Sequence, residues 1–252
     1  MTSLVEASGL TVVYGGVVAL DAVDLTVAAG ELVGLVGANG VGKTTLLACL
    51  SGHIKPAIGR VRYRGADVSR RGPDARARLG IVRSFQDARL FPSMPVWQAL
   101  LLAEERKDPT GTAASLLALP GWRAAEDRRS RDAAKLALTM GLDGHLDKVV
   151  GELSTGLRRV LDLACAIALA PRLLLLDEPS AGLAAPEAVA LAEVLTRVRE
   201  LTGATVVMVE HDLPLVWALA DRIVVLEEGA VVASGRPPEV RDHPAVAFGE
   251  FG

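Results

Sequence analysis

The stretch Gly37-Ala-Asn-Gly-Val-Gly42-Lys43-Thr44 follows a short aliphatic run, Leu32–Val36, and precedes a segment of helical composition at 43–50. A glycine, four intervening residues and then Gly-Lys-Thr form the pattern of a loop that cradles phosphates. Glycines let backbone N–H groups approach an anion at the start of a helix, where the helix dipole favours negative charge. The stretch therefore predicts a strand, a phosphate-binding loop and a helix, which together begin an α/β fold.

Each part of this loop has a predicted role. Its backbone N–H groups are expected to bind phosphate oxygens, and the Lys43 ammonium adds a positive charge beside the β- and γ-phosphates of a nucleotide. The Thr44 hydroxyl is a predicted ligand of Mg²⁺. The predicted nucleotide-binding residues of this segment are Gly37, Ala38, Asn39, Gly40, Val41, Gly42, Lys43, Thr44 and Thr45.

A second aliphatic run, Leu173-Leu-Leu-Leu176, ends in two carboxylates, Asp177 and Glu178. A continuous run of this kind is typical of a strand that is buried on both faces of a parallel sheet. Asp177, at the mouth of the strand, is predicted to hold Mg²⁺ through water, and Glu178 to orient or deprotonate the attacking water. Taken alone, the two acids could simply end a strand, but downstream of a phosphate loop the catalytic interpretation is favoured.

Three further side chains are candidates for the same site. His211 follows a predicted strand at 204–209, at the carboxyl end where ligands bind in open α/β sheets, so we expect it to contact the γ-phosphate. Gln86 ends a short predicted strand at 81–84, and its amide is expected to reach Mg²⁺ or the attacking water. Tyr14 could stack on adenine, although a tyrosine at a strand end also fits packing in the core or at its rim.

The rest of the chain predicts two kinds of structure. Strands at 4–14 and 20–27, separated by the turn signal Gly15-Gly16, begin the chain, and residues 87–148 show helical periodicity with Pro and Gly breaks. Alternating strands and helices elsewhere predict a parallel sheet with helices on both sides. The expected elements are strands at 59–64, 173–176 and 223–226, and helices at Val96–Lys107, 113–119, 124–140, 157–170 and 186–201.

Composition limits the possible functions. The net charge of −3 argues against a dedicated nucleic-acid binder, so no nucleic-acid partner is expected. No apolar run approaches the ~18 residues that a membrane span needs, so any membrane association is expected to come through a partner. Cys49 and Cys165 both lie in apolar, helical context and are expected to be small buried hydrophobes in a reducing compartment.

One segment departs from the average charge. Between Arg60 and Arg89 the chain carries nine arginines and only three aspartates. The simplest interpretation is a solvated face rich in arginine. The alternative is a surface that faces anionic lipid headgroups.

In their order along the chain, these motifs resemble those of the ABC ATPases. The phosphate loop corresponds to Walker A, Gln86 to the Q-loop residue, Asp177-Glu178 to the end of Walker B and His211 to the switch histidine. Leu153-Ser-Thr-Gly-Leu157 is similar to the signature segment of that family. The resemblance covers essentially the whole chain and is carried by the ordered combination rather than by any single motif.

The resemblance implies a phosphate-loop NTPase (RecA-like) α/β core with an N-terminal antiparallel β subdomain and an inserted α-helical subdomain. The chain is then a single domain of residues 1–252, with a core of 1–86 and 149–252 and a helical subdomain of 87–148. It also implies that two subunits bind head to tail around two ATP molecules. Each ATP lies between Walker A of one subunit and Ser154 and Gly156 of the other, although an ordinary helix N-cap explains Ser154 equally well.

Several stretches are similar to the ATP-binding subunits of branched-chain (hydrophobic) amino acid importers, and the length and the long insertion favour the larger of the two ATPases of such a system. These stretches are Arg83-Ser-Phe-Gln86-Asp-Ala-Arg-Leu-Phe91-Pro92, the insertion 105–131, Glu210-His211-Asp212-Leu-Pro-Leu-Val216 and Pro238-Glu-Val240 with His243-Pro244. The alternatives are an importer of urea, amides or other solutes, and an ABC exporter. A phosphate-loop kinase would not need Ser154, Gly156 and His211, and a GTPase would carry an Asn-Lys-x-Asp motif, which is absent.

This likeness implies partners and a location. The cofactors are ATP and Mg²⁺, and the partners are transmembrane permease subunits, a second ABC ATPase in a homo- or heterodimer and, indirectly, an external solute-binding protein. The chain is expected at the cytoplasmic face of the cell (inner) membrane as a peripheral subunit. Leu90, Phe91, Pro92 and Met94 are a candidate permease-docking surface, with the core of the helical subdomain as the alternative.

The chain departs from the family pattern at three positions. Thr155 replaces the usual glycine and Leu157 the usual glutamine of the signature, and Ala184 stands where the family normally has aspartate. In the implied dimer these positions act on the ATP of the partner. We therefore expect that, in a heterodimer, the site built on this chain's Walker motifs hydrolyses ATP well and the opposite site less well.

Overall fold

The computed structural model describes residues 3–84, 91–107 and 120–247. Contacts divide the chain into two compact units. The first, hereafter the sheet unit, consists of Met1–Gln86, Arg172–Ala181 and Leu195–Gly252. The second, hereafter the helical unit, consists of Asp87–Pro171 and Gly182–Val194.

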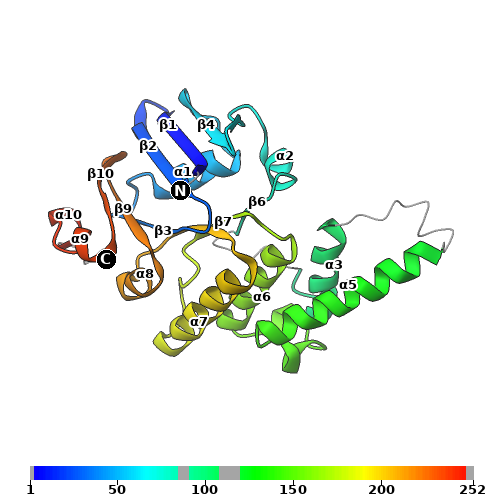
Figure 1. The fold of residues 1–252 in the computed structure, drawn as a ribbon. Coiled ribbons are helices and arrows are strands. Elements are labelled where there is room, and N and C mark those ends of the chain that lie inside the picture. Colours follow the sequence, from blue (N-terminus) through cyan, green and yellow to red (C-terminus); the bar gives the residue numbers. More distant parts are fainter. Residues whose placement is uncertain (1–2, 85–90, 108–119, 248–252) are drawn as a thin grey trace. The chain divides into compact units, whose positions relative to one another are not determined.

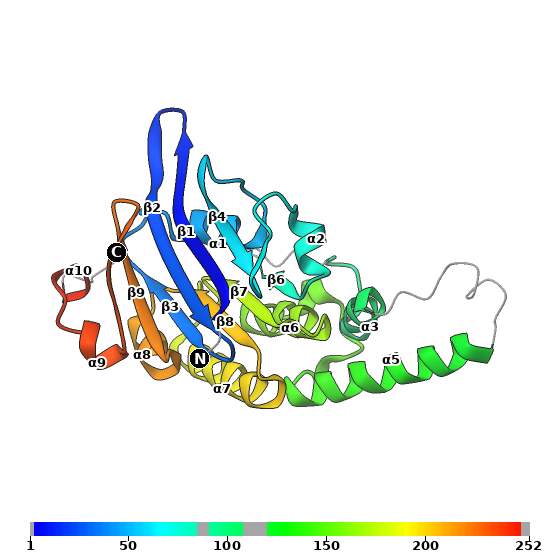
Figure 2. The ribbon, with the colours of Figure 1, turned by 45° about the horizontal axis from the view of Figure 1, so that its top comes forward.

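An antiparallel sheet begins the sheet unit, as expected. Its order is β2-β1-β4-β5, formed by β1 (Ser3–Tyr14), β2 (Val17–Ala28), β4 (Ile58–Tyr63) and β5 (Ala66–Asp67). The predicted turn Gly15-Gly16 closes the long β1–β2 hairpin of Figure 2, with φ angles of 53° and 92°. Positive φ at both central residues is the requirement of a tight hairpin turn, which explains the two glycines.

A second, mixed sheet contains six strands in the order β10-β9-β3-β8-β7-β6 (Figure 1). They are β3 (Leu32–Val36), β6 (Ile81–Arg83), β7 (Leu173–Asp177), β8 (Thr205–Val209), β9 (Arg222–Glu227) and β10 (Ala230–Gly235). β6, β7, β8, β3 and β9 are mutually parallel, which confirms the predicted parallel sheet, while β10 pairs antiparallel with β9 and was not expected from its sequence.

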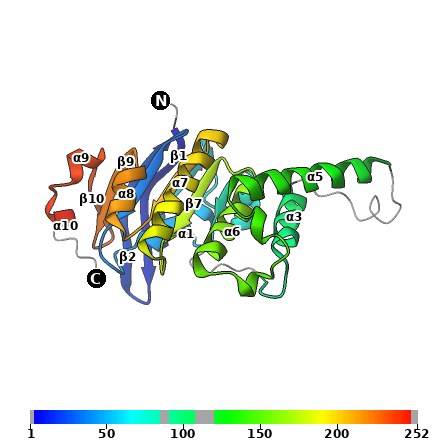
Figure 3. The ribbon, with the colours of Figure 1, turned by 90° about the horizontal axis from the view of Figure 1, so that it is seen from below.

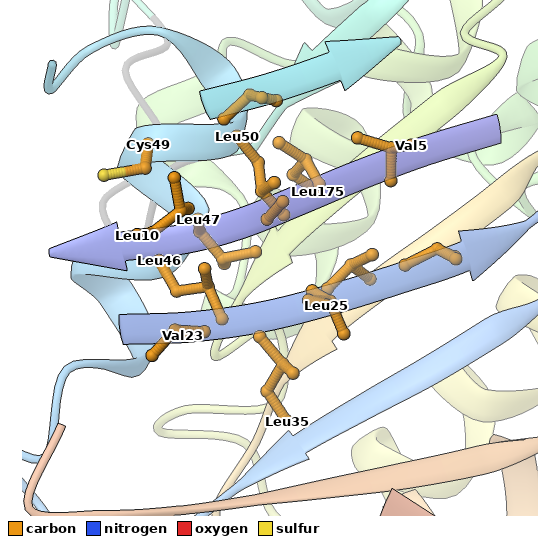
Figure 4. Close-up of a cluster of buried hydrophobic side chains, with 14 of the residues drawn as sticks. Val5, Leu10, Val23, Leu25, Leu35, Leu46, Leu47, Cys49, Leu50 and Leu175 are labelled. Carbon is orange, nitrogen blue, oxygen red and sulfur yellow. The ribbon is translucent and has the colours of Figure 1, made fainter. Parts of the chain in front are cut away.

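The main hydrophobic core lies between the two sheets, around α1 (Lys43–Ser51). Figure 4 shows Leu46, Leu47 and Leu50 of α1 among side chains from β1, β2, β3 and β7. The other face of β3 is covered by α8 (Leu213–Leu219), which approaches so closely that a Cβ on Gly34 would lie 2.6 Å from Val216 Cγ1. Since side chains alternate along a strand, β3 can be buried on both faces. The phosphate loop, which begins directly after β3, therefore starts from a fixed position.

The helical unit is built on three long helices, α3 (Val96–Lys107), α5 (Pro120–Thr139) and α6 (Thr155–Ala168), which lie side by side (Figure 3). Short 3₁₀ turns, Asp143–His145 and Val150–Glu152, connect α5 to α6. This compact unit extends past the expected boundary at residue 148, because α6 packs against α3 and α5. The helix expected at 113–119 lies outside the described residues.

The remaining helices complete the described chain. α7 (Ala185–Thr202) begins in the helical unit and ends in the sheet unit. α2 (Pro73–Ala77), α9 (Pro237–Val240) and α10 (Pro244–Ala247) belong to the sheet unit and are short. Pro186, in the first turn of α7, fits the preference of proline for helix starts.

The expectation of a solvated arginine face is wrong for Arg76, which is fully buried. Its Nη1 donates hydrogen bonds to the carbonyls of Cys49 (2.6 Å) and Leu50 (2.7 Å), in the last turn of α1. Its Nη2 and Nε donate to the carbonyls of Val68 (2.7 Å) and Arg71 (3.0 Å). The guanidinium thus satisfies carbonyls that the helix leaves without an intrahelical partner, and it ties α1 to residues 68–71.

Both cysteines are free thiols, as expected. Burial raises the pKa of Cys49 to about 11 and that of Cys165 to about 12. Because the thiolate is the reactive form, neither cysteine is a nucleophile at neutral pH.

Asp162 of α6 leads to a prediction about stability. Burial raises its pKa to about 6, although the charge of Arg159 lowers it in part. The folded-state pKa lies above the ordinary value, so the ionised carboxylate costs stability, and this cost grows as the pH rises from 4 through 6. A shift of this size corresponds to at most about 3 kcal/mol.

We therefore expect Asp162→Asn to raise the Tm by about 5 °C at pH 7.5 and by less than half as much at pH 4.5. Thermal unfolding followed by circular dichroism at both pH values measures this. The matched control is Asp127→Asn, which changes an exposed aspartate of α5 and should leave the Tm unchanged. An equal gain at the two pH values would show that the charge of Asp162 is not the cause.

Candidate active site

The phosphate loop connects β3 to α1, which confirms the predicted order of strand, loop and helix. Gly42, at the start of α1, has a φ of 104°, and a Cβ there would lie 2.3 Å from the Ala19 carbonyl oxygen of β2. A Cβ on Gly37 would lie 2.2 Å from the Leu226 carbonyl oxygen of β9. Only glycine fits these two positions, because the backbones of neighbouring strands approach the loop on two sides.

Lys43 lies inside this loop. Its side chain is buried, and its Nζ donates hydrogen bonds to the carbonyls of Gly37 (2.7 Å) and Ala38 (2.8 Å). Burial lowers the pKa of the ammonium, while the charges of Glu178 and Asp177 raise it. The structure therefore brings one cation and two acidic side chains of the predicted site together.

Asp177, at the end of β7, connects the phosphate loop to the neighbouring strand. Its Oδ1 accepts a hydrogen bond from Thr44 Oγ1 at 3.1 Å. Hydroxyl and carboxylate oxygens are ligands that Mg²⁺ prefers, so these two residues fit a magnesium ion.

The second oxygen of Asp177 is paired with Arg83. The Oδ2 atom lies 2.6 Å from Arg83 Nη2, and the two side chains are only 4% and 9% exposed. Arg83 was expected in the solvated face, and this expectation is wrong. It ends β6, which pairs with β7, and the carboxyl ends of parallel strands meet at one edge of a sheet. Once β6 and β7 are predicted to be neighbouring strands, the positions of Arg83 and Asp177 at their carboxyl ends could have indicated this ion pair.

Glu178 and His211 form a second pair at the same edge. His211 Nε2 lies 2.8 Å from Glu178 Oε1, and the two side chains are 24% and 20% exposed. His211 Nδ1 is buried and has no hydrogen-bond partner among the residues that the structure describes. This geometry fits a neutral imidazole that carries its proton on Nε2 and donates it to an ionised carboxylate.

The backbone of Glu178 has a left-handed conformation, with a φ of 49°. Such values are uncommon for residues with a Cβ and concentrate at functional sites. The Glu178 N–H donates a hydrogen bond to the Val209 carbonyl at 2.9 Å, at the end of β8. The unusual turn thus fixes Glu178 beside the strand that leads to His211.

The other predicted residues of the sheet unit have different outcomes. Tyr14 is 48% exposed at the end of β1, so it is not a core residue. Its stacking role stays a prediction. Gln86 lies outside the described residues, and its predicted role stays a prediction as well.

The signature residues belong to the helical unit. Ser154 is the N-cap of α6, and its hydroxyl accepts a hydrogen bond from the Leu157 N–H at 3.2 Å. Gly156 is buried against a carboxylate that was not expected there, because a Cβ on it would lie 2.6 Å from Glu187 Oε1. The other Glu187 oxygen accepts a hydrogen bond from the Ala184 N–H at 3.1 Å. One side chain thus connects the signature to Ala184, while the contact with a nucleotide stays a prediction.

The candidate docking surface is partly described. Phe91 is 64% exposed, and Trp97 of α3 is 45% exposed, so the alternative of a core position is wrong for Phe91. Leu90 lies outside the described residues. Exposed aromatic side chains of this size are consistent with a surface that a partner covers.

Comparison with known proteins gives consistent results. The sequence model of the family described as ABC transporter matches residues 20–181. The chain is 37% identical to the high-affinity branched-chain amino acid transport ATP-binding protein BraF of Pseudomonas aeruginosa PAO1, over 96% of this chain and 95% of that protein. It is 36% identical to the corresponding protein LivG of Escherichia coli K12, with the same coverage.

A solved structure shows the same fold. The ADP conformation of MJ1267, an ATP-binding cassette of an ABC transporter, superimposes with a TM-score of 0.84 at 28% identity and covers 100% of both chains. The predicted α/β fold with an antiparallel β subdomain and a helical insertion is confirmed.

Proposed function

The chain belongs to the ABC transporter family, and we propose that it hydrolyses ATP to energise the import of branched-chain or related hydrophobic amino acids. One observation carries the hydrolytic part of this proposal. The phosphate loop, Asp177 and the Glu178–His211 pair meet at the carboxyl edge of one parallel sheet. The likeness to BraF and LivG over nearly the whole chain supports the choice of solute.

The binding residues have proposed roles that follow from their positions. The loop N–H groups and Lys43 bind the phosphates, and Tyr14 stacks on the adenine. Thr44 and Asp177, with Gln86, would hold Mg²⁺, whose positive charge would offset that of the phosphates. Arg83 pairs with Asp177 Oδ2 and so holds the carboxylate with its Oδ1 toward Thr44.

The catalytic residues act on the attacking water. Glu178 accepts a proton from that water, because its carboxylate is the anionic acceptor beside the phosphate loop. His211 donates its Nε2 proton to Glu178 in the present structure and would turn the same proton toward the γ-phosphate. Ser154 and Gly156 would contact the ATP of a partner subunit.

The proposed partners are transmembrane permeases, a second ABC ATPase and, indirectly, a solute-binding protein. Among the helices that the structure describes, none is both long and apolar enough to cross a bilayer. Phe91 and Trp97 offer exposed apolar surface to a permease. We propose a peripheral position at the cytoplasmic face of the cell membrane.

Reconstitution tests this function. The chain is co-purified with its two permeases and second ATPase in liposomes, and ATP hydrolysis is measured with the solute-binding protein loaded with leucine, isoleucine or urea. We expect leucine or isoleucine to stimulate hydrolysis and Lys43→Ala to abolish it at this chain's site. Stimulation by urea alone would replace the proposed solute, and no ATP hydrolysis by any combination would contradict the function itself.

A further inference from the structure

A buried carboxylate that the proposed chemistry does not use lies directly behind the catalytic pair. Glu210, between β8 and His211, is only 2% exposed. Its Oε1 accepts a hydrogen bond from the Ser180 N–H at 2.7 Å, and its Oε2 accepts one from the His211 N–H at 3.1 Å. Ser180 lies two residues beyond Glu178, so Glu210 contacts the backbone next to both members of the Glu178–His211 pair.

The position of Glu210 explains why a carboxylate is needed. The ladder between β7 and β8 ends where Asp177 pairs with Val209. Beyond that point the segments that follow β7 and β8 diverge into loops, and their N–H groups need acceptors that the sheet no longer provides. Glu210 supplies two oxygens, one to each loop, and so connects the two loops where the hydrogen bonds between β7 and β8 end.

Two opposing effects act on the pKa of Glu210. Burial raises the pKa of Glu210 above its ordinary value, although its hydrogen bonds with Ser180, His211 and Asp212 lower it in part. An ionised carboxylate is an acceptor only, which suits the three backbone N–H donors of Ser180, His211 and Asp212. A glutamine of the same shape has a single acceptor oxygen, and its NH₂ group would face either the Ser180 N–H or the N–H groups of His211 and Asp212.

We infer that Glu210 is a positioning residue that holds His211 and Glu178 in register with each other for ATP hydrolysis, an inference that rests on the proposed function. It acts through the backbone of the two loops and does not touch the nucleotide. The two loops are thus connected twice. The partly exposed side chains of Glu178 and His211 contact each other at 2.8 Å, and the buried Glu210 accepts hydrogen bonds from the backbone of both loops.

The test compares Glu210→Gln with Val207→Ala in the reconstituted complex. Val207 is a fully buried core residue of the same strand, β8, so its truncation also lowers stability but leaves the edge of the sheet unchanged. We expect Glu210→Gln to lower the kcat of ATP hydrolysis about 10- to 100-fold, the scale of a small misplacement of catalytic groups. The KM and the affinity for a fluorescent ATP analogue should stay within about threefold, and Val207→Ala should keep its kcat within about twofold.

Two results would overturn the inference. One is a kcat of Glu210→Gln equal to that of Val207→Ala, and the other is a loss of kcat matched by an equal loss of nucleotide affinity. If Glu210→Gln does not fold, Glu210→Asp answers the same question, because it keeps the charge but is too short to reach the N–H groups of both loops. Failure of the wild-type complex to bind or hydrolyse ATP would instead contradict the proposed function.

Discussion

Replacing Glu178 by Gln is expected to lower ATP turnover at the site built on this chain's phosphate loop at least about 100-fold. Glutamine keeps the size of the side chain and can still accept the His211 Nε2 hydrogen bond, but it cannot take a proton from water. Nucleotide binding should persist, because the phosphate loop and Lys43 are unchanged. Single-turnover hydrolysis and the affinity for a fluorescent ATP analogue measure the two properties separately.

The same change in the partner ATPase tests whether the two sites of a heterodimer are unequal. Thr155, Leu157 and Ala184 of this chain would face the partner's ATP, so that site is expected to contribute less turnover. The Glu178→Gln loss should therefore exceed the loss from the equivalent change in the partner. Equal losses would contradict the asymmetry. Glu227→Gln, at the exposed end of β9, is the matched control and should leave turnover unchanged.

Replacing Arg76 by Met is expected to lower the free energy of unfolding by about 3–5 kcal/mol, because it removes the donors of three buried hydrogen bonds and one partly buried hydrogen bond. Methionine fills much of the same space, but the Leu50 carbonyl at the end of α1 loses the Arg76 donor, and the Cys49 carbonyl keeps only the longer hydrogen bond from the Gly52 N–H (3.3 Å). Urea unfolding followed by circular dichroism gives the change in midpoint and slope.

The control for this change is Arg78→Met, two residues further along the same arginine-rich segment. Arg78 is exposed, and its replacement should alter stability by less than about 0.5 kcal/mol. If the two variants unfold at the same urea concentration, the buried hydrogen bonds of Arg76 do not contribute as inferred.

The elements that could be predicted from the sequence are those with a strong local pattern. Leu32–Val36 and Leu173–Asp177 are aliphatic along their length because both faces of each strand are buried, and the glycine loop between strand and helix is a local motif. β10 could not be predicted, since it is an edge strand whose residues are half-buried or exposed. Its sequence carries no clear alternation of apolar and polar residues.

The site residues divide in the same way. Lys43, Asp177, Glu178 and His211 stand at the ends of predicted elements, and the structure places them together. Arg83 was missed because its partner Asp177 lies 94 residues away. Nothing in the local pattern distinguishes it, or Arg76, from the exposed arginines between residues 60 and 78. Glu210 has the same difficulty, since only the tertiary structure shows that its carboxylate faces inward.

The close fit of Gly42 against Ala19 has a mechanical consequence. Ala19 follows the hairpin turn by a few residues, and Tyr14 precedes the same turn. A sideways displacement of the hairpin would drive the Ala19 carbonyl into the Gly42 backbone, where there is no room even for a methyl group. The start of α1 and strand β2 therefore pack so closely here that a shift of Ala19 toward Gly42 requires the backbone of the phosphate loop to move as well.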